Sequence, residues 1–156
     1  MLATDPETLH VRAATIAELC SSACALIAAN ADEVVEAYRG RPIAPDWARY
    51  LQIEQAGALV VRAAYVDGQM VGYCVAFLAD HLHYQLRYAL VDSLFVAAEH
   101  RDAGVCSELM RAMREHCRAI GIERLVWAAP PGSRMETVMR QHRFAALETT
   151  YYEDLG

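Results

Sequence analysis

The dipeptide Asp67-Gly68 separates two runs of β-type residues, "LVVRAAYV" over 59–66 and "QMVGYCVAFL" over 69–78. An Asp-Gly pair between such runs favours a type I′ turn, which joins two antiparallel strands. A third apolar run, "YALVDSLFV" over 88–96, follows a loop that contains "DHLHYQLR". We therefore expect an antiparallel β-meander in the middle of the chain.

Helical periodicity precedes and follows this meander. Within the first forty residues, apolar side chains recur at helical spacing and predict one helix or a helix pair: Ile16, Leu19, Cys20, Ala23, Leu26 and Ile27. Asp46 is a candidate N-cap for a short helix that begins at Trp47. An amphipathic helix is expected between Gly104 and Gly121, because a glycine commonly ends a helix.

The last third of the chain predicts two more strands and one more helix. The segment "RLVWAA" over 124–129 is typical of a strand, Ser133 and Glu136 have the spacing of a capping box, and "FAALETTYY" over 144–152 predicts a final strand. This order of elements predicts a single domain over residues 1–156 of mixed α/β (α+β) class. We expect a central, mostly antiparallel, twisted sheet flanked by helices.

Composition limits the classes of function. The chain has 156 residues, 55% of them hydrophobic, with a formal net charge of −6. An acidic domain of this kind is expected to bind no nucleic acid, whereas a cationic acceptor is compatible with it. No apolar stretch approaches the roughly 18 residues of a membrane span, and the first residues, "MLATDPETLH", do not resemble a signal peptide. Five cysteines without a CxxC pair indicate reduced thiols in the cytoplasm and no metal site.

The segment "VDSLFVAAEHRDAGVCSELM" over 91–110 passes from a predicted strand through a charged turn into a predicted helix. Backbone N–H groups are unpaired at the start of a helix and can converge on an anion such as a pyrophosphate. Gly104 can adopt a positive φ and allows a ligand to approach the backbone closely. The alternative interpretation is an ordinary strand-to-helix turn that is capped by Asp102.

The same segment resembles the acyl-CoA binding motif of the GNAT superfamily of N-acetyltransferases, R/Q-x-x-G-x-G/A, which here reads from Arg101 to Cys106. The preceding hairpin and the following "GIERLVW" and "RF" extend the resemblance over about residues 59 to 152. It implies an N-acetyltransferase that uses acetyl-CoA as co-substrate and transfers the acetyl group directly in a ternary complex. The cofactor-binding residues that it implies are Leu94, Phe95, Val96, Arg101, Asp102, Ala103, Gly104, Val105, Cys106 and Ser107.

The chain departs from the family pattern at three positions, one of which is Asp102, a carboxylate where the family often has a neutral or basic residue. Cys106 replaces the final Gly or Ala of the loop motif, and Met139 stands where the family often has a tyrosine, five residues before Phe144. These departures keep two alternatives open. One is a catalytically degenerate member that binds acyl-CoA as a regulator, and the other is a partner-binding α/β domain without a CoA site.

Three side chains are candidates for catalysis. Asp92 is a lone carboxylate in an apolar strand and could serve as the base that deprotonates an amine of a small molecule or peptide. His83, two residues after His81, could line the acceptor pocket, and Tyr152 could replace the missing acid. The competing interpretations are a structural aspartate, loop histidines at the surface, and aromatic packing of Tyr151 and Tyr152. The sequence is also compatible with a homodimer.

Overall fold

The computed structural model describes residues 8–33 and 40–155. Its centre is a five-stranded sheet in the order β1-β2-β3-β4-β5. The strands are β1 (His10–Ala14), β2 (Leu59–Val66), β3 (Gln69–His81), β4 (Leu86–Val96) and β5 (Arg124–Val126). Neighbouring strands are antiparallel except for β4 and β5, which are parallel. The predicted mixed α+β class with a mostly antiparallel sheet is confirmed.

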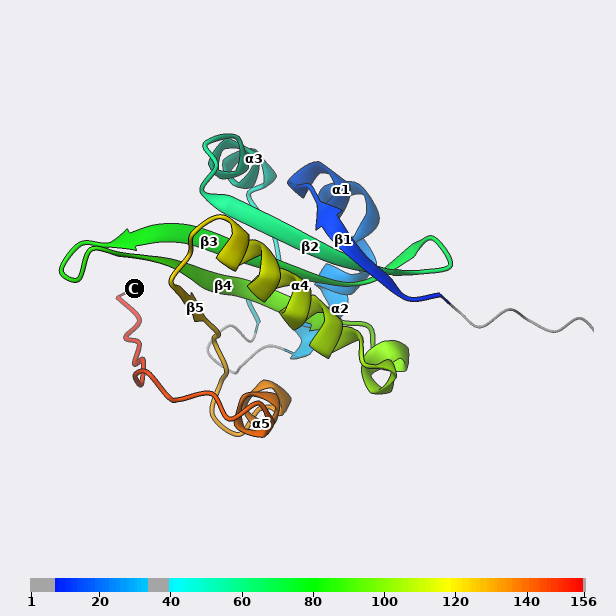
Figure 1. The fold of residues 1–156 in the computed structure, drawn as a ribbon. Coiled ribbons are helices and arrows are strands. Elements are labelled where there is room, and N and C mark those ends of the chain that lie inside the picture. The colour runs from blue at the N-terminus through cyan, green and yellow to red at the C-terminus, as the bar shows by residue number, and fades with distance from the viewer. Residues whose placement is uncertain (1–7, 34–39, 156) are drawn as a thin grey trace, which may run out of the picture.

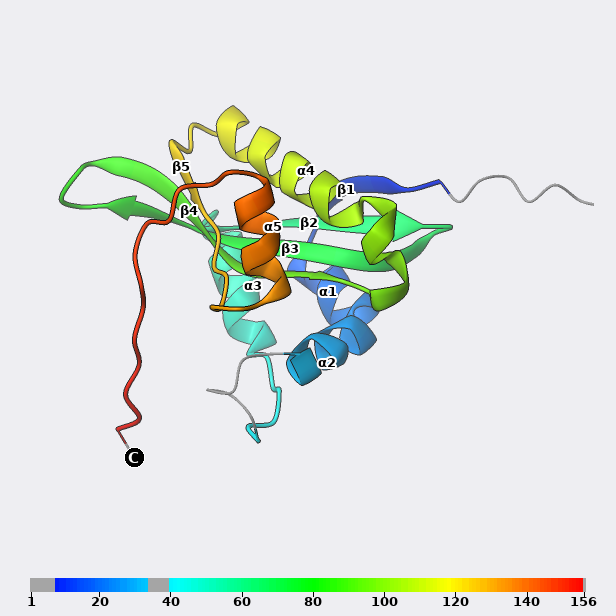
Figure 2. The same cartoon turned by 90° about the horizontal axis from the view of Figure 1, so that it is seen from below.

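Helices cover both faces of this sheet. They are α1 (Ile16–Ser22), α2 (Cys24–Glu33), α3 (Trp47–Gln55), α4 (Val105–Ala119) and α5 (Arg134–Gln141), with a 3₁₀ helix over Ala98–Ala103. Helix α4 lies across one face, helices α1, α2 and α3 lie on the other, and α5 stands beside β5 (Figures 1 and 2). The sheet is therefore the middle of three layers.

Each face of the sheet carries its own hydrophobic core. Beneath α4, a continuous stripe of the helix is buried against the sheet, as the sequence periodicity predicts: Val105, Leu109, Met110, Met113 and Cys117. On the opposite face, Ile16 and Leu19 of α1 pack with Tyr73, Val75 and Phe95 of the sheet. Because both faces are buried, the central strands are fixed in position and can hold functional groups at their ends and edges.

Several local predictions are confirmed. Asp67 and Gly68 have φ values of 49° and 80°, as a type I′ turn requires. The Asp46 carboxylate accepts a hydrogen bond from the Arg49 backbone N–H at the start of α3. The Ser133 hydroxyl accepts one from the Glu136 backbone N–H at the start of α5. These contacts depend on residues only a few positions apart, which is why the sequence alone could predict them.

Two predictions about strands are wrong. The first forty residues were expected to form one helix or a helix pair, but residues 10–14 form strand β1 and pair with β2. The final strand predicted over 144–152 does not form, and every side chain from 141 to 155 is exposed. Strand β5 ends at Val126, soon before Pro130 and Pro131, which have no backbone N–H to donate to a sheet. The edge available to a further strand is therefore short.

The hairpin of β3 and β4 is longer than predicted and projects beyond the other strands (Figure 1). Its turn covers 82–85, so part of the expected loop belongs to the strands. Positions 34–39 of the predicted N-terminal helix pair lie outside the described residues. Residues 1–7 lie outside them as well, and within the described part of the first forty residues α1 and α2 agree with the predicted helix pair, whereas 10–14 form β1.

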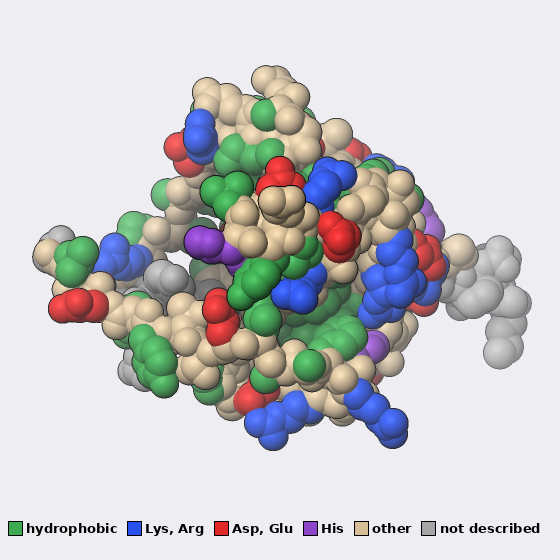
Figure 3. Space-filling model, turned by 60° about the vertical axis from the view of Figure 1, so that its left-hand side comes forward, with side chains coloured by type: hydrophobic (Ala, Val, Ile, Leu, Met, Phe, Trp, Pro, Cys, Tyr) green, Lys and Arg blue, Asp and Glu red, His purple; other side chains and the backbone are tan. Residues whose placement is uncertain are grey.

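The surface carries both signs of charge. Figure 3 shows acidic and basic side chains interspersed around a central area of hydrophobic side chains on one face of the molecule. Among the described residues, no helix is both long and apolar enough to cross a membrane.

Candidate active site

A β-bulge in β4 determines how the central site is built. The register between β3 and β4 pairs Val75 with Ser93 and Ala76 with Val91, so Asp92 is the extra residue. Successive side chains of a regular strand point to opposite faces, and a bulge interrupts this alternation. Asp92 and Ser93 therefore line the same cavity although they are adjacent in the sequence.

This cavity has a volume of about 170 Å³ and opens on the face that α1, α2 and α3 cover. Its walls are mainly apolar and include Ile16, Leu19, Ile27, Ile43, Trp47 and Val75. Polar groups reach it from Asn30, Tyr50, Tyr73, Asp92 and Ser93. The bulge thus places one carboxylate at the rim of an apolar pocket.

Tyr50 of α3 holds this carboxylate. Its hydroxyl donates a hydrogen bond of 2.9 Å to Asp92 Oδ2. The Tyr50 ring stacks on Phe77, with 5.9 Å between ring centroids, and this contact limits its movement. Burial, and then the negative charge of Asp92, raise the pKa of Tyr50 above its ordinary value. Tyr50 therefore stays protonated at neutral pH and remains a hydrogen-bond donor.

A second tyrosine lies deeper in the same pocket. Tyr73 of β3 is 3% exposed, and its hydroxyl oxygen accepts a hydrogen bond of 3.2 Å from Asn30 Nδ2 of α2. Burial raises the pKa of Tyr73, while the bond from Asn30 acts in the opposite direction. The pocket consequently contains two neutral phenols and one carboxylate.

The edge of β4 next to the bulge is open. Strand β5 pairs with β4 only from Tyr88 to Leu90, and the chain then diverges towards α5 (Figure 1). From Val91 to Val96, no strand within the described part of the chain pairs with this edge of β4. Backbone groups of an unpaired edge can bind an extended ligand. The predicted cofactor-contacting residues Leu94, Phe95 and Val96 lie in this stretch.

The open edge leads directly to the predicted anion-binding loop. Gly104 has a φ of 77°, as expected, and α4 begins at the next residue. Over the residues that the structure describes, no side chain caps the start of α4. The first N–H groups of α4, which include those of Val105, Cys106 and Ser107, therefore remain available to an anion.

Arg101 is already bound within the chain. Its Nε donates to the Val96 carbonyl oxygen at 2.9 Å, and its Nη2 donates to Glu33 Oε1 of α2 at 2.7 Å. The guanidinium carbon also lies 5.2 Å from the centroid of the Phe95 ring. Arg101 thus fixes the loop against β4 and α2, and the contact with phosphate expected for it stays a prediction.

The remaining loop residues are exposed to different degrees. The Asp102 side chain is fully exposed and caps neither helix, with its Oδ1 3.6 Å from Arg134 Nη2. The alternative of a turn capped by Asp102 is therefore wrong. Ala103 is exposed, and Cys106 is partly buried in a way that raises the pKa of its thiol.

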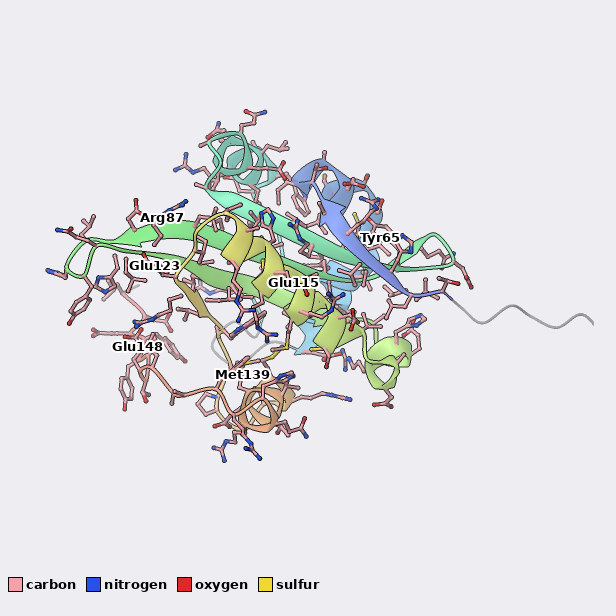
Figure 4. The ribbon with its side chains drawn as sticks, in the orientation of Figure 1. Tyr65, Arg87, Glu115, Glu123, Met139 and Glu148 are labelled. Atoms are coloured by element: carbon pink, nitrogen blue, oxygen red, sulfur yellow. The ribbon has the colours of Figure 1, made fainter. Side chains whose placement is uncertain are left out.

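The other catalytic candidates lie outside the cavity lining. His83 is exposed in the turn of the β3–β4 hairpin, where its ring centroid is 6.1 Å from that of His81. Tyr152 lies in the C-terminal segment and is 72% exposed. Met139 is on α5, beside β5 and away from α3 (Figure 4). The structure therefore brings only Asp92 of the three candidates together with the pocket, and the roles of His83 and Tyr152 stay predictions.

Sequence reasoning missed Tyr50, Tyr73 and Asn30 as site residues. The helix that contains Tyr50 was predicted from its cap, but its contact with Asp92 spans 42 positions. Such a contact depends on how α3 packs against the sheet, and neither segment carries a local signal of it. Over the described residues, no group of three metal-ligating side chains is found.

The site therefore combines the uncapped start of α4, the open edge of β4 and an adjoining pocket that contains a carboxylate, all on an α+β fold. The chain matches the model of the acetyltransferase (GNAT) family over residues 26–144 and belongs to this family. It is therefore an acyltransferase. No curated protein sequence matches significantly.

Solved structures of acetyltransferases share the fold. A ribosomal-protein-alanine N-acetyltransferase from Brucella melitensis is 21% identical, with a TM-score of 0.74 and coverage of 96% of this chain and 100% of that one. An aminoglycoside acetyltransferase from an uncultured soil sample, in complex with sisomicin, is 16% identical, with a TM-score of 0.73 and coverage of 95% and 97%. Glucosamine-6-phosphate N-acetyltransferase from Arabidopsis thaliana is 13% identical, with a TM-score of 0.69 and coverage of 95% and 100%.

Proposed function

We propose that the protein transfers an acetyl group from acetyl-CoA to an amine of a small molecule or peptide within a ternary complex. The observation that carries this proposal is the position of Asp92. The bulge directs its carboxylate into the pocket, while the adjoining edge of β4 is open and leads to the uncapped start of α4. An acceptor amine and an acyl thioester can therefore meet at the bulge.

Acetyl-CoA supplies an acetyl group that is activated as a thioester. The transfer forms a bond between the amine nitrogen and the acetyl carbon and breaks the bond from that carbon to sulfur, so that CoA leaves as the thiol. A lysine-like amine has a reference pKa of about 10.4 and must lose a proton before it can attack. Asp92 accepts this proton directly or through one water.

The chain's groups fit the two ends of the donor. The open edge from Val91 to Val96 offers backbone groups to an extended amide-containing arm, although the Val96 carbonyl already accepts from Arg101. The N–H groups at the start of α4 offer donors to a pyrophosphate, and the helix dipole adds about 0.3–1 kcal/mol for an anion there. The positive φ of Gly104 forms this turn without strain.

Acetyl-CoA binding tests the donor half of the proposal. A ligand that binds only the folded state stabilises it by about 2.7 kcal/mol at a hundred times its dissociation constant, so acetyl-CoA should raise Tm. Gly104→Val should abolish this shift, because a β-branched residue is strained at positive φ and its bulk obstructs the phosphate.

Gly57→Val is the matched control. Gly57 has a φ of 70°, and a Cβ added at Gly57 or at Gly104 would meet nothing within 4 Å. The two variants therefore introduce the same backbone strain, but only one changes the loop. If Gly57→Val binds acetyl-CoA and Gly104→Val does not, the loop is the binding site. Equal acetyl-CoA affinity of both variants would show that the loop is not the binding site.

Release of free CoA thiol in the presence of amines tests the acceptor half. The expected result is thiol release that depends on an amine and is matched by acetylated product in mass spectrometry. Binding of acetyl-CoA without turnover on any amine would favour the acyl-CoA-binding regulator. Absence of both binding and turnover would favour the partner-binding domain.

A further inference from the structure

The acceptor side of the site is small and mostly apolar. Its volume of about 170 Å³ is close to that of an engineered protein cavity of about 150 Å³ that holds one benzene molecule. Ile16, Leu19 and Val75 form walls that are 1%, 2% and 3% exposed and belong to the core. The pocket therefore has room for about one ring, or for a short branched chain, between rigid walls.

The pocket also has few charged side chains. Of the described residues that line the pocket, Asp92 alone has a charged side chain. A second cavity of about 110 Å³, which Tyr50 also lines, has one acidic and one basic side chain in its lining, Asp46 and Arg49, and so carries no net charge. The pocket thus offers one carboxylate, which can pair with one ammonium group. A second buried charge of either sign would lose its hydration without gaining a partner among these lining residues.

The carboxylate is positioned to orient this single ammonium. Tyr50 engages Asp92 Oδ2, and a carboxylate can accept further hydrogen bonds because it has two oxygens. The rings of Trp47 and Tyr50 line the same pocket, 6.1 Å apart between centroids. Aromatic faces attract both a cation and an apolar group.

We propose, as a refinement that rests on the proposed acetyltransferase function, that the acceptor is a compact monoamine with an apolar body of about one ring. The amine lies at Asp92, and its body extends between α1, α2 and α3. The site selects against polycationic amines and against amino sugars that carry a phosphate, because their additional charges have no partner among the described residues that line the pocket.

Four amines test this selectivity. We would measure kcat/KM by thiol release with saturating acetyl-CoA for ethylamine, 2-phenylethylamine, spermidine and glucosamine 6-phosphate. Since one methylene group in an apolar pocket is worth about tenfold or more, 2-phenylethylamine should exceed ethylamine by at least about tenfold. It should exceed spermidine and glucosamine 6-phosphate by at least the same factor.

A variant at the rim tests the location of the body. Ile43 lines the pocket and is 51% exposed, so Ile43→Trp can fill the entrance without disturbing a core. This variant should lower the preference for 2-phenylethylamine over ethylamine by about tenfold, because a change of one methylene group in an apolar pocket already alters kcat/KM by about that factor. Leu82→Trp is the control, because Leu82 is 85% exposed at the hairpin turn and does not line the pocket. It should leave the preference unchanged.

The outcomes separate this inference from the function on which it rests. Faster acetylation of spermidine or glucosamine 6-phosphate than of 2-phenylethylamine would overturn the inference and leave the acetyltransferase proposal intact. An unchanged preference in Ile43→Trp would also overturn it, since the body would then lie elsewhere. Failure of all four amines together with failure of acetyl-CoA to shift Tm would instead refute the proposed function itself.

Discussion

Replacing Asp92 by asparagine removes the proposed base and keeps the shape of the site. The amide oxygen of asparagine can still accept the hydrogen bond that Tyr50 donates over 2.9 Å. Because Asp92 is exposed, the free energy of unfolding should change by no more than about 0.5 kcal/mol. Loss of a general base typically lowers turnover by about 10²–10⁴-fold, and we expect that loss at pH 7 with acetyl-CoA affinity nearly unchanged.

The pH dependence of the Asp92→Asn variant gives the sharper test. With an amine pKa of about 10.4, the neutral fraction of the acceptor rises about tenfold per pH unit, or about 100-fold between pH 7 and pH 9. The variant should recover by up to that factor, because a neutral amine no longer needs the base. The assay is kcat/KM from thiol release at both pH values. Equal activity of variant and parent at pH 7, or a defect that is the same at both pH values, would refute the assignment of Asp92 as the base.

Two further predictions concern the framework around the site. A Cβ added at Gly72 would lie 2.9 Å from the Phe95 carbonyl oxygen. Gly72→Ala should therefore cost about 1–3 kcal/mol of stability and lower Tm in calorimetry. An unchanged Tm would show that the backbone of β3 and β4 can shift apart at this point without an energetic cost. Glu33→Gln removes the charge that Arg101 contacts at 2.7 Å. Since Glu33 is half exposed, stability should change by less than about 1 kcal/mol. Titration calorimetry should show tighter acetyl-CoA binding in this variant, whereas weaker binding would mean that the ion pair pre-organises the loop.

Those parts of the fold that depend on neighbouring residues could be predicted from the sequence. The turn at Asp67-Gly68 requires two positive φ values that this pair adopts readily, and the caps of α3 and α5 each bind a backbone N–H three positions away. The buried stripe of α4 follows from its helical period alone. A positive φ was expected at Gly104 because glycine adopts one without steric cost, and its φ is 77°.

Pairing between distant segments was decided by the tertiary structure. Strand β1 is five residues long with no clear alternation of burial, and it forms because β2 offers it an edge. The segment over 144–152 has a stronger β pattern but pairs with no strand among the described residues, because β5 is only three residues long. Strand formation depends on an available edge, which local sequence does not encode.

The candidate site shows the same division. The sequence identified Asp92 as a lone carboxylate in an apolar strand, together with the loop from Arg101 to Ser107, since both are contained in one continuous segment. It could not show that a bulge turns Asp92 towards the pocket, nor that Tyr50 reaches it from a helix 42 positions earlier. The sequence by itself therefore determined the chemical groups and their local turns. Only the packing of α1, α2 and α3 on the sheet decided which of those groups meet, because that packing sets the distances between residues far apart in the chain.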